Sequence, residues 1–138
     1  MADLAITAAN VLKGANAVFQ AGIAGATITA GQPLYLDSNT NTYKLADADA
    51  SAAAATVVGV SLNGASSGQP VSINFSDDDF TTGGTMTVGA IYILSNNAGG
   101  VTLASSLTTG WYPNVVYIAK STTKAVLAIA QQVTAAVP

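Results

Sequence analysis

Short runs of β-branched and aromatic residues, separated by clusters of turn-forming residues, are the feature that most restricts the fold of this chain. Val, Ile, Tyr and Phe favour extended strands, whereas Gly, Asn, Asp and Ser favour the tight turns between strands. Helix signals are scarce by comparison. The runs that predict strands are Leu34–Leu36, Thr56–Val60, Val71–Phe75, Ile91–Leu94, Val115–Ile118 and Ala125–Ile129.

One of these runs also indicates how its strand is buried. Val71, Ile73 and Phe75 alternate with Ser72 and Asn74. A period of two is typical of a strand with one face on the core and the other in solvent. We therefore predict an all-β fold, a compact β-barrel or sandwich of about 8–11 short strands with at most one or two short helical turns.

The segment Asp47–Ala55 is the best candidate for such a helical turn. Alanine favours helix, and an Asp at the start can cap free backbone N–H groups. The segment is nine residues long, which is below the length at which a helix is stable alone. A flexible loop of small residues is the alternative.

The chain matches itself when it is shifted by 58 residues. The shift runs without a gap from residue 28 to residue 60, beyond which the loop 62–70 must be longer than its counterpart 120–124. We predict two similar β-units, 28–75 and 86–130, that share one core. Chance identity among common residue types is the alternative. The aligned pairs are Thr29/Thr87, Gly31/Gly89, Leu36/Leu94, Leu45/Leu103, Ala46/Ala104, Val57/Val115, Val58/Val116 and Val60/Ile118.

The first twenty residues differ from the rest of the chain. Their apolar residues follow neither a helical nor a strand period. We expect residues 1–20 to form an N-terminal arm that orders on a neighbouring molecule, with a possible first strand at Ala17–Gln20. A first strand with a frayed end is the alternative. Residues 21–138 are predicted to form a single β domain.

Charged residues are scarce in this chain, and their distribution excludes several partners. Only 8% of the residues are charged, and the net charge is −3. The lysines at positions 13, 44, 120 and 124 are scattered, whereas nucleic-acid binding needs clustered cations, so we expect no direct nucleic-acid contact. No run approaches the ~20 apolar residues of a membrane helix, so we expect no membrane partner. A nearly neutral surface repels its own copies weakly, which suits packing in an array.

Side chains that could carry catalysis are also few. The chain has no His and no Cys, so no triad that depends on them can form. The adjacent pairs Lys120-Ser121 and Thr123-Lys124 lie in a predicted hairpin turn, where these residue types are ordinary. A single Trp argues against an extended sugar cleft. We therefore expect no enzymatic activity, no catalytic residues and no cofactor.

Two acidic segments are candidates for cation binding. The run from Asp37 to Asn41 opens like an EF-hand loop, but Thr42 stands where Gly is required and Ala48 where Glu is required. A hairpin turn, in which Asp and Asn bond to the local backbone, explains this run better. Asp77–Asp79 is a weak candidate for a surface calcium site, and a solvated loop is the favoured alternative.

Several segments together resemble the small head decoration (cement) proteins of tailed bacteriophages. The residues that carry the resemblance are Ala30–Asp37, Tyr43–Asp49, Val57–Val60, Gly68–Val71 and Gly89–Ser95. The resemblance implies a β-barrel or sandwich that forms a homodimer or homotrimer on the exterior of the capsid. It also implies that the protein bridges neighbouring subunits of the major capsid protein. It carries over no catalytic residue.

We therefore expect a virion structural protein that binds the outside of the assembled phage head and stabilises contacts between major capsid subunits. The residues expected to contact the capsid are Leu4, Ile6, Val11 and Leu12 on the N-terminal arm. The alternative is a carbohydrate- or host-binding module on the virion surface, with a site formed by Trp111, Tyr112 and Asp77–Asp79. Trp111-Tyr112-Pro113 is otherwise a rigid corner packed on the core.

Overall fold

The computed structural model describes residues 3–129 and 135–138 and is almost entirely β. The prediction of an all-β fold with about 8–11 strands is confirmed, since the described residues form ten strands and two isolated 3-10 turns. The turns are η1 (Ala8–Asn10) and η2 (Ala104–Ser106). The strands are β1 (Val18–Ile23), β2 (Pro33–Asp37), β3 (Thr42–Leu45), β4 (Gly59–Ser61), β5 (Pro70–Ser76), β6 (Phe80–Thr81), β7 (Ile91–Leu94), β8 (Val101–Leu103), β9 (Val115–Ala119) and β10 (Lys124–Leu127).

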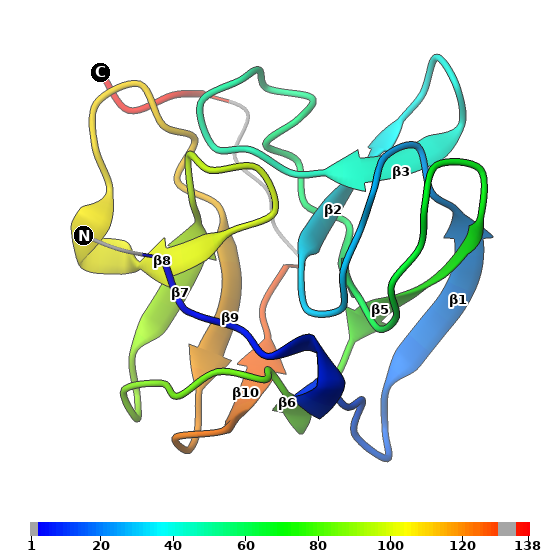
Figure 1. Ribbon diagram of the computed structural model, residues 1–138. Coiled ribbons are helices and arrows are strands. Elements are labelled where there is room, and N and C mark those ends of the chain that lie inside the picture. The colour runs from blue at the N-terminus through cyan, green and yellow to red at the C-terminus, as the bar shows by residue number, and fades with distance from the viewer. Residues whose placement is uncertain (1–2, 130–134) are drawn as a thin grey trace.

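The strands form two antiparallel sheets of five strands each. The first sheet has the order β1-β5-β4-β2-β3, and the second has the order β6-β10-β9-β7-β8. Figure 1 shows the first sheet on the right of the molecule and most of the second on the left. Adding five to every strand number converts the first order into the second. The two halves of the chain therefore have the same topology, as the predicted pair of β-units requires.

The register of the strands repeats as well. Leu34 pairs with Leu45, and 58 residues further along the chain Tyr92 pairs with Leu103. All three β7–β8 pairs repeat a β2–β3 pair at this offset, and both β2–β4 pairs recur between β7 and β9. A one-residue slip would move every side chain to the opposite face. The shared register therefore confirms that the two β-units are similar in three dimensions.

The repeat loses its constant offset where the sequence predicted, in the loop before the last strand of each unit. Ser61 pairs with Ile73, with eleven residues between them, whereas Ala119 pairs with Ala125, with five between them. The first unit therefore has the longer loop. This loop contributes Leu62 and Asn63 to the groove described below.

Two clusters of buried side chains hold the molecule together. The smaller lies within the first unit and comprises Ala24, Ile28, Leu34, Ala65, Val71 and Ile73. The larger contains residues of both units, among them Val57 and Val60 from the first and Leu94, Val116 and Tyr117 from the second. The expected shared core is therefore present, but the first unit also has an apolar interior of its own.

The segment Asp47–Ala55, for which the sequence left a short helical turn and a loop of small residues as alternatives, contains turns and no helix. The segment contains hydrogen-bonded turns, in which Ala55 N donates to Ser51 O at 3.0 Å and Ser51 Oγ accepts from Ala54 N. Ala48, Ala54 and Ala55 are buried. A helix of nine residues is too short to be stable alone, and the segment forms turns instead.

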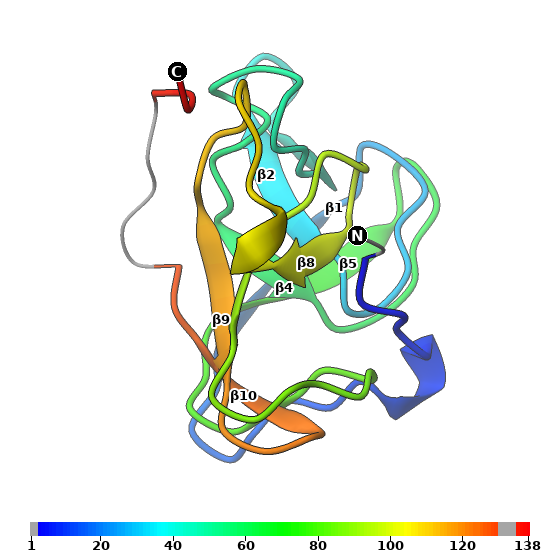
Figure 2. The same cartoon turned by 90° about the vertical axis from the view of Figure 1, so that its left-hand side faces the viewer.

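The N-terminal segment, residues 3–17, lies along the second sheet. Leu4 N donates to Val101 O of β8 at 2.8 Å, and Leu12 exchanges backbone hydrogen bonds of 2.9 and 3.1 Å with Thr81 of β6. Figure 2 shows the segment descending one side of the molecule from beside β8. It therefore covers backbone at both edges of the second sheet. The expected first strand begins at Val18 and extends to Ile23; ordering of the arm on a neighbouring molecule stays a prediction.

Tyr117 contributes a buried hydroxyl that has no hydrogen-bond partner among the described residues. Its ring packs against Phe80 and Tyr92, with centroid distances of 6.1 and 5.8 Å. Burial raises the pKa of the Tyr117 hydroxyl, so this group stays neutral. The phenol therefore contributes apolar area, while its oxygen has lost water without compensation.

Tyr117→Phe should stabilise the protein, because it removes an unpaired buried hydroxyl and keeps the ring. We expect a gain of about 1 kcal/mol in unfolding free energy and a rise of a few degrees in Tm. Tyr92→Phe is the matched control, because Tyr92 Oη accepts a 3.0 Å hydrogen bond from Thr87 N. That control should lower the Tm. The measurement is thermal unfolding followed by circular dichroism. An equal drop in Tm for both variants would contradict this expectation.

Candidate contact surface

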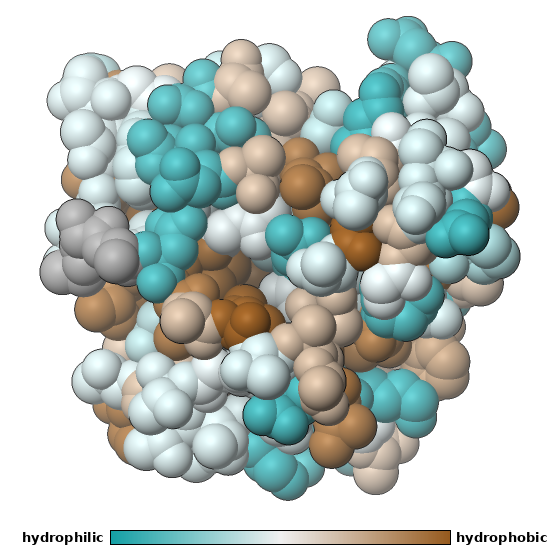
Figure 3. Space-filling model, in the orientation of Figure 1, coloured by the Kyte–Doolittle hydropathy of each residue, from teal (hydrophilic) through white to brown (hydrophobic). Residues whose placement is uncertain are grey.

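The structure gives the four residues predicted to contact a capsid different environments. Leu4 and Ile6 are half-buried and pack against the larger core cluster. Val11 is a core residue, only 7% exposed, whereas Leu12 is 62% exposed. Figure 3 shows apolar side chains where the N-terminal segment crosses the face, surrounded by near-neutral and hydrophilic ones. Of the four, Leu12 is the one that is largely free for a partner in the described chain.

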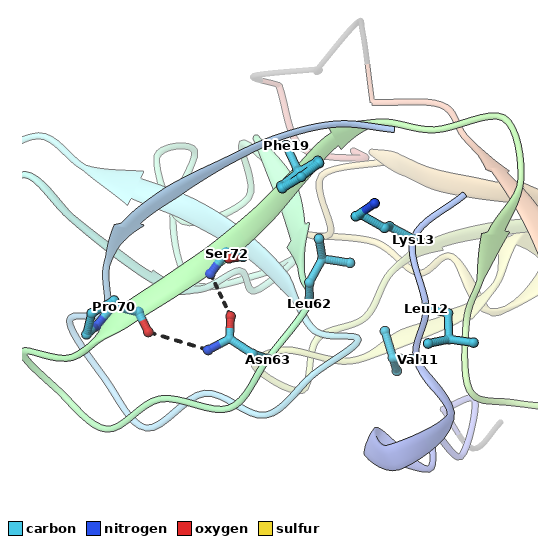
Figure 4. A pocket seen from close by; sticks show the side chains of 8 residues that line it. All are labelled: Val11, Leu12, Lys13, Phe19, Leu62, Asn63, Pro70 and Ser72. Atoms are coloured by element: carbon cyan, nitrogen blue, oxygen red, sulfur yellow. Dashed lines mark hydrogen bonds between the residues drawn. The ribbon is translucent and has the colours of Figure 1, made fainter. Parts of the chain in front are cut away.

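Leu12 lies at one wall of an open groove of about 420 Å³. Figure 4 shows the lining side chains, which come from the N-terminal segment, β1, β5 and the loop after β4. Apolar side chains line most of the groove, with Lys13, Asn63 and Ser72 as its polar residues. The lining residues are Val11, Leu12, Lys13, Phe19, Leu62, Asn63, Pro70 and Ser72.

The polar groups on one side of the groove are fixed by the backbone. Asn63 Oδ1 accepts a 2.7 Å hydrogen bond from Ser72 N, and Asn63 Nδ2 donates to Pro70 O at 3.4 Å. These bonds attach the long β4–β5 loop to β5. The wall that carries Leu62 is therefore held in place by interactions within the first unit.

The charge at the groove comes from Lys13. Its ammonium nitrogen lies 4.8 Å from the centre of the Phe19 ring, within the range of a cation–π interaction. Lys13 takes part in none of the ion pairs found among residues 3–129 and 135–138. The groove therefore combines apolar walls with a cation that no carboxylate of the described chain neutralises.

Sequence reasoning missed Phe19, Leu62 and Pro70 as residues of this surface. Val18-Phe19 is an apolar pair within the irregular N-terminal region, and nothing in its pattern shows which neighbours cover it. The structure leaves Phe19 49% exposed. The sequence did offer one signal for Phe19: it is an aromatic residue within the N-terminal segment that was predicted to contact a partner.

Asp77, one of the weak calcium candidates, is buried and fully occupied by the protein itself. It is 3% exposed. Its Oδ2 accepts hydrogen bonds of 2.8 Å from Gly14 N and from Asn74 Nδ2, and its Oδ1 accepts one of 3.0 Å from Asp79 N. The expectation of a solvated loop is wrong for this residue. Asp77 fixes the N-terminal segment to the end of β5.

The other two acids of the run have separate partners. Asp79 forms ion pairs of 2.7 Å with Lys120 and 3.1 Å with Lys124, and hydrogen bonds first from Lys120 and then from Lys124 hold its pKa below the ordinary value. Asp78 is exposed and lies 3.5 Å from Asn16 Nδ2. Within the described residues, no cluster of three acidic, His or Cys side chains could hold a metal ion.

The second acidic segment forms the hairpin turn that the sequence predicts. Asp37 Oδ1 accepts from Asn39 N at 3.0 Å, and Asp37 Oδ2 pairs with Lys44 Nζ at 2.7 Å across the β2–β3 hairpin. The hydrogen bond from Lys44 is the main cause of the lowered pKa of Asp37. Asn41 has a φ of 57°, a conformation that Asn tolerates in turns.

The adjacent Ser and Lys residues also belong to a turn. Ser121 Oγ accepts hydrogen bonds from Thr123 N at 3.3 Å and from Lys124 N at 2.9 Å, within the β9–β10 connection. Lys120 and Lys124 point to Asp79. The side chains that a Ser–Lys dyad would use are thus engaged in a structural hairpin.

The alternative carbohydrate site is not assembled in the described structure. Trp111 and Tyr112 are half-buried and pack against the larger core cluster, and Tyr112 N donates to Ala48 O at 2.8 Å. Their loop joins the C-terminal residues through two bonds between Val137 and the Gly110-Trp111 backbone. Figures 1 and 2 place this loop at the opposite end of the molecule from the β5–β6 turn, which carries Asp77–Asp79.

The described residues include no helix with the length and hydropathy needed to cross a membrane. Comparison with models of known protein families finds no match, and comparison with curated proteins finds none either. A proposal of function therefore rests on the residues and their geometry.

Proposed function

We propose that this chain is a virion structural protein that binds the exterior of an assembled phage head and stabilises contacts between major capsid subunits. It acts without catalysis, cofactor or direct contact with nucleic acid or membrane. It works as a homodimer or homotrimer on the virion surface. The resemblance of its turns and strands to head decoration proteins supports this proposal, as does a chain that is only 8% charged.

The observation that carries the proposal is the exposed Leu12 beside an apolar groove. A side chain that is 62% exposed contributes binding energy only when a partner covers it. The groove walls are attached to folded strands on both sides, so little ordering is required on binding. A segment of the major capsid protein that presents an apolar side chain and a carboxylate would match the groove and Lys13.

Leu12→Asp should weaken binding to the shell without unfolding the protein. Burying a carboxylate against apolar walls is unfavourable, so we expect at least a tenfold loss of affinity, equivalent to about 1.4 kcal/mol or more. The measurement is occupancy on purified shells of the parent phage after co-sedimentation. A deletion of residues 1–12 is less suitable, because it also removes the buried Val11.

Val88→Asp is the matched control for that experiment, because Val88 is 61% exposed and does not line the groove. Its occupancy should stay within about twofold of the unaltered protein, an allowance set by the small effects of surface substitutions. Equal occupancy for the Leu12→Asp variant and the unaltered protein would show that the groove does not contribute to binding the shell. Failure of the unaltered protein to bind shells at all would reject the proposed function.

A further inference from the structure

The long loop between β4 and β5 carries the one Asn-Gly pair of the chain, Asn63-Gly64. The side-chain amide of an Asn can be attacked by the backbone nitrogen of the residue that follows it. Glycine permits this attack best, because it has no Cβ and the widest range of backbone conformations. Every other Asn of the chain precedes a residue that carries a Cβ. Position 63 is therefore the asparagine at which the chain itself offers the least hindered nucleophile.

The backbone nitrogen of Gly64 is accessible in the folded protein. Gly64 is exposed, and its N–H donates to no acceptor among the described residues. The next amide, Ala65 N, instead donates to Ile28 O at 2.9 Å. A Cβ added at Gly64 would meet only Ile28 O, at 3.5 Å. Solvent can therefore reach the Gly64 N–H and remove its proton.

The side chain of Asn63 is directed toward this nitrogen and polarised by the fold. Asn63 Nδ2 donates to Gly64 O at 2.9 Å, which turns the side-chain amide toward the peptide that follows it. Asn63 Oδ1 accepts a 2.7 Å hydrogen bond from Ser72 N, and Figure 4 shows this bond beside the one to Pro70 O. A fixed backbone N–H stabilises negative charge that develops on a carbonyl oxygen under attack. Ser72 N–H occupies that position at Asn63.

We propose that Asn63 is a site of self-modification, which converts to aspartate and isoaspartate in the folded protein through a cyclic imide formed with Gly64. Hydroxide removes the proton from Gly64 N, whose electron pair then forms a bond to Asn63 Cγ. The negative charge moves to Asn63 Oδ1, where Ser72 N–H stabilises it. As the carbonyl re-forms, the bond from Cγ to Nδ2 breaks and ammonia leaves with a proton taken from water.

Water then opens the imide ring at one of its two carbonyls. Attack at Cγ breaks the bond to Gly64 N and leaves aspartate. Attack at the backbone carbonyl of Asn63 breaks the main-chain bond, so the chain continues through the side chain as isoaspartate. The net change is the uptake of one water and the loss of one ammonia, and no oxidant or reductant takes part.

The modification changes the charge of the groove, because Asn63 and Lys13 both line it. A carboxylate at position 63 offsets the charge of Lys13 and repels an acidic partner, and it cannot donate to Pro70 O as Asn63 Nδ2 does. This consequence rests on the proposed function, in which the groove receives a carboxylate of the major capsid protein. The reaction would then limit how long the free protein keeps its affinity for a shell.

Peptide mapping by mass spectrometry tests the reaction on the free protein. After incubation at mildly alkaline pH, aspartate and isoaspartate should accumulate at position 63 ahead of every other Asn, at a rate that rises with hydroxide concentration. Gly64→Ala should slow the reaction about tenfold or more, because the added Cβ hinders the attack. Ser66→Ala is the matched control in the same loop and should leave the rate unchanged.

Circular dichroism checks that each variant is folded, and the unaltered chain in urea shows the rate without the fold. The proposal is overturned if Asn63 stays intact in the folded chain while it reacts in urea, because the hydrogen bonds of Asn63 would then protect it. An unchanged rate in Gly64→Ala would overturn it as well.

Asn63→Asp reproduces the aspartate product and tests its effect on the groove. This variant should bind purified shells about tenfold more weakly than the unaltered protein, because like charges repel across a contact. Asn39→Asp is the control, because it adds the same charge at an exposed position in the β2–β3 hairpin, outside the groove. Equal binding by Asn63→Asp and the unaltered protein would overturn the effect on the groove. Failure of the unaltered chain to bind shells would reject the proposed function but not the modification, which is measured without shells.

Discussion

Replacing Asp77 with Ala should lower the unfolding free energy by about 3–5 kcal/mol, the largest effect expected for a single substitution in this chain. The carboxylate is 3% exposed and accepts hydrogen bonds from Gly14 N, Asn74 Nδ2 and Asp79 N. The Ala variant leaves buried donors without an acceptor, and each such donor loses its hydration without compensation. Urea unfolding followed by fluorescence of Trp111 would measure the change.

Two further variants separate hydrogen bonding from charge. Asp78→Ala changes an exposed neighbour and should alter stability by no more than about 0.5 kcal/mol. Asp77→Asn keeps the shape of the side chain but replaces one acceptor oxygen with a donor. Its loss of unfolding free energy should therefore lie between those of Asp77→Ala and Asp78→Ala. An Asp77→Ala loss below about 1 kcal/mol, on the scale of a single ordinary hydrogen bond, would show that the contact to the N-terminal segment contributes little.

The second large effect is expected at Gly31, which has a φ of +89°. A Cβ at this position would lie 2.9 Å from Ile6 Cγ2 and 3.0 Å from Val11 Cγ2. Gly31→Ala therefore combines an unfavourable backbone conformation with overpacking against the N-terminal segment, and we expect a loss of about 2–4 kcal/mol. Chemical denaturation of the variant and the unaltered protein measures this loss of unfolding free energy.

The internal repeat provides the matched control for this substitution. Gly89 lies 58 residues after Gly31 and has a φ of +79°, but a Cβ at Gly89 would meet no other atom within 4 Å. Gly89→Ala should therefore show the backbone cost alone, about 1–2 kcal/mol. The difference between the two variants measures how tightly the N-terminal segment packs on the core. Equal losses of unfolding free energy in the two variants would mean that the N-terminal segment moves away from the added Cβ without a measurable energetic cost.

Hydrogen exchange gives an independent readout of the same contact. Leu12 N donates to Thr81 O at 3.1 Å, so its amide proton is protected only while the segment is docked. Gly31→Ala should accelerate exchange at Leu12, whereas Gly89→Ala should leave it close to its original rate.

Strands whose side chains carry strong β preference could be located from the sequence. Ile91–Leu94 coincides with β7, and Val71–Phe75 lies within β5. Thr56–Val60 was less accurate, since β4 begins only at Gly59. Phe80–Thr81 and Val101–Leu103 were missed, because a strand of two or three residues has too short a pattern to recognise and depends on its neighbours for pairing.

The candidate contact surface was predicted only in part. Leu12 is among the predicted contact residues and is exposed, but Val11 beside it is buried. Both are aliphatic residues in an irregular segment, so no periodicity separates them. Their environments differ because the backbone bridge between Leu12 and Thr81 fixes the segment and turns adjacent side chains in opposite directions.

The sequence by itself determined the all-β class, the duplicated β-unit and the lack of His, Cys and clustered cations, because these follow from composition, alternation and spacing along the chain. Tertiary structure alone decided that Asp77 is buried and that a groove forms beside Leu12. Each of these depends on which distant segments meet: Gly14 with Asp77, or Leu12 with Thr81. Local preference sets the strands, whereas burial and exposure are set by neighbours that the linear order does not reveal.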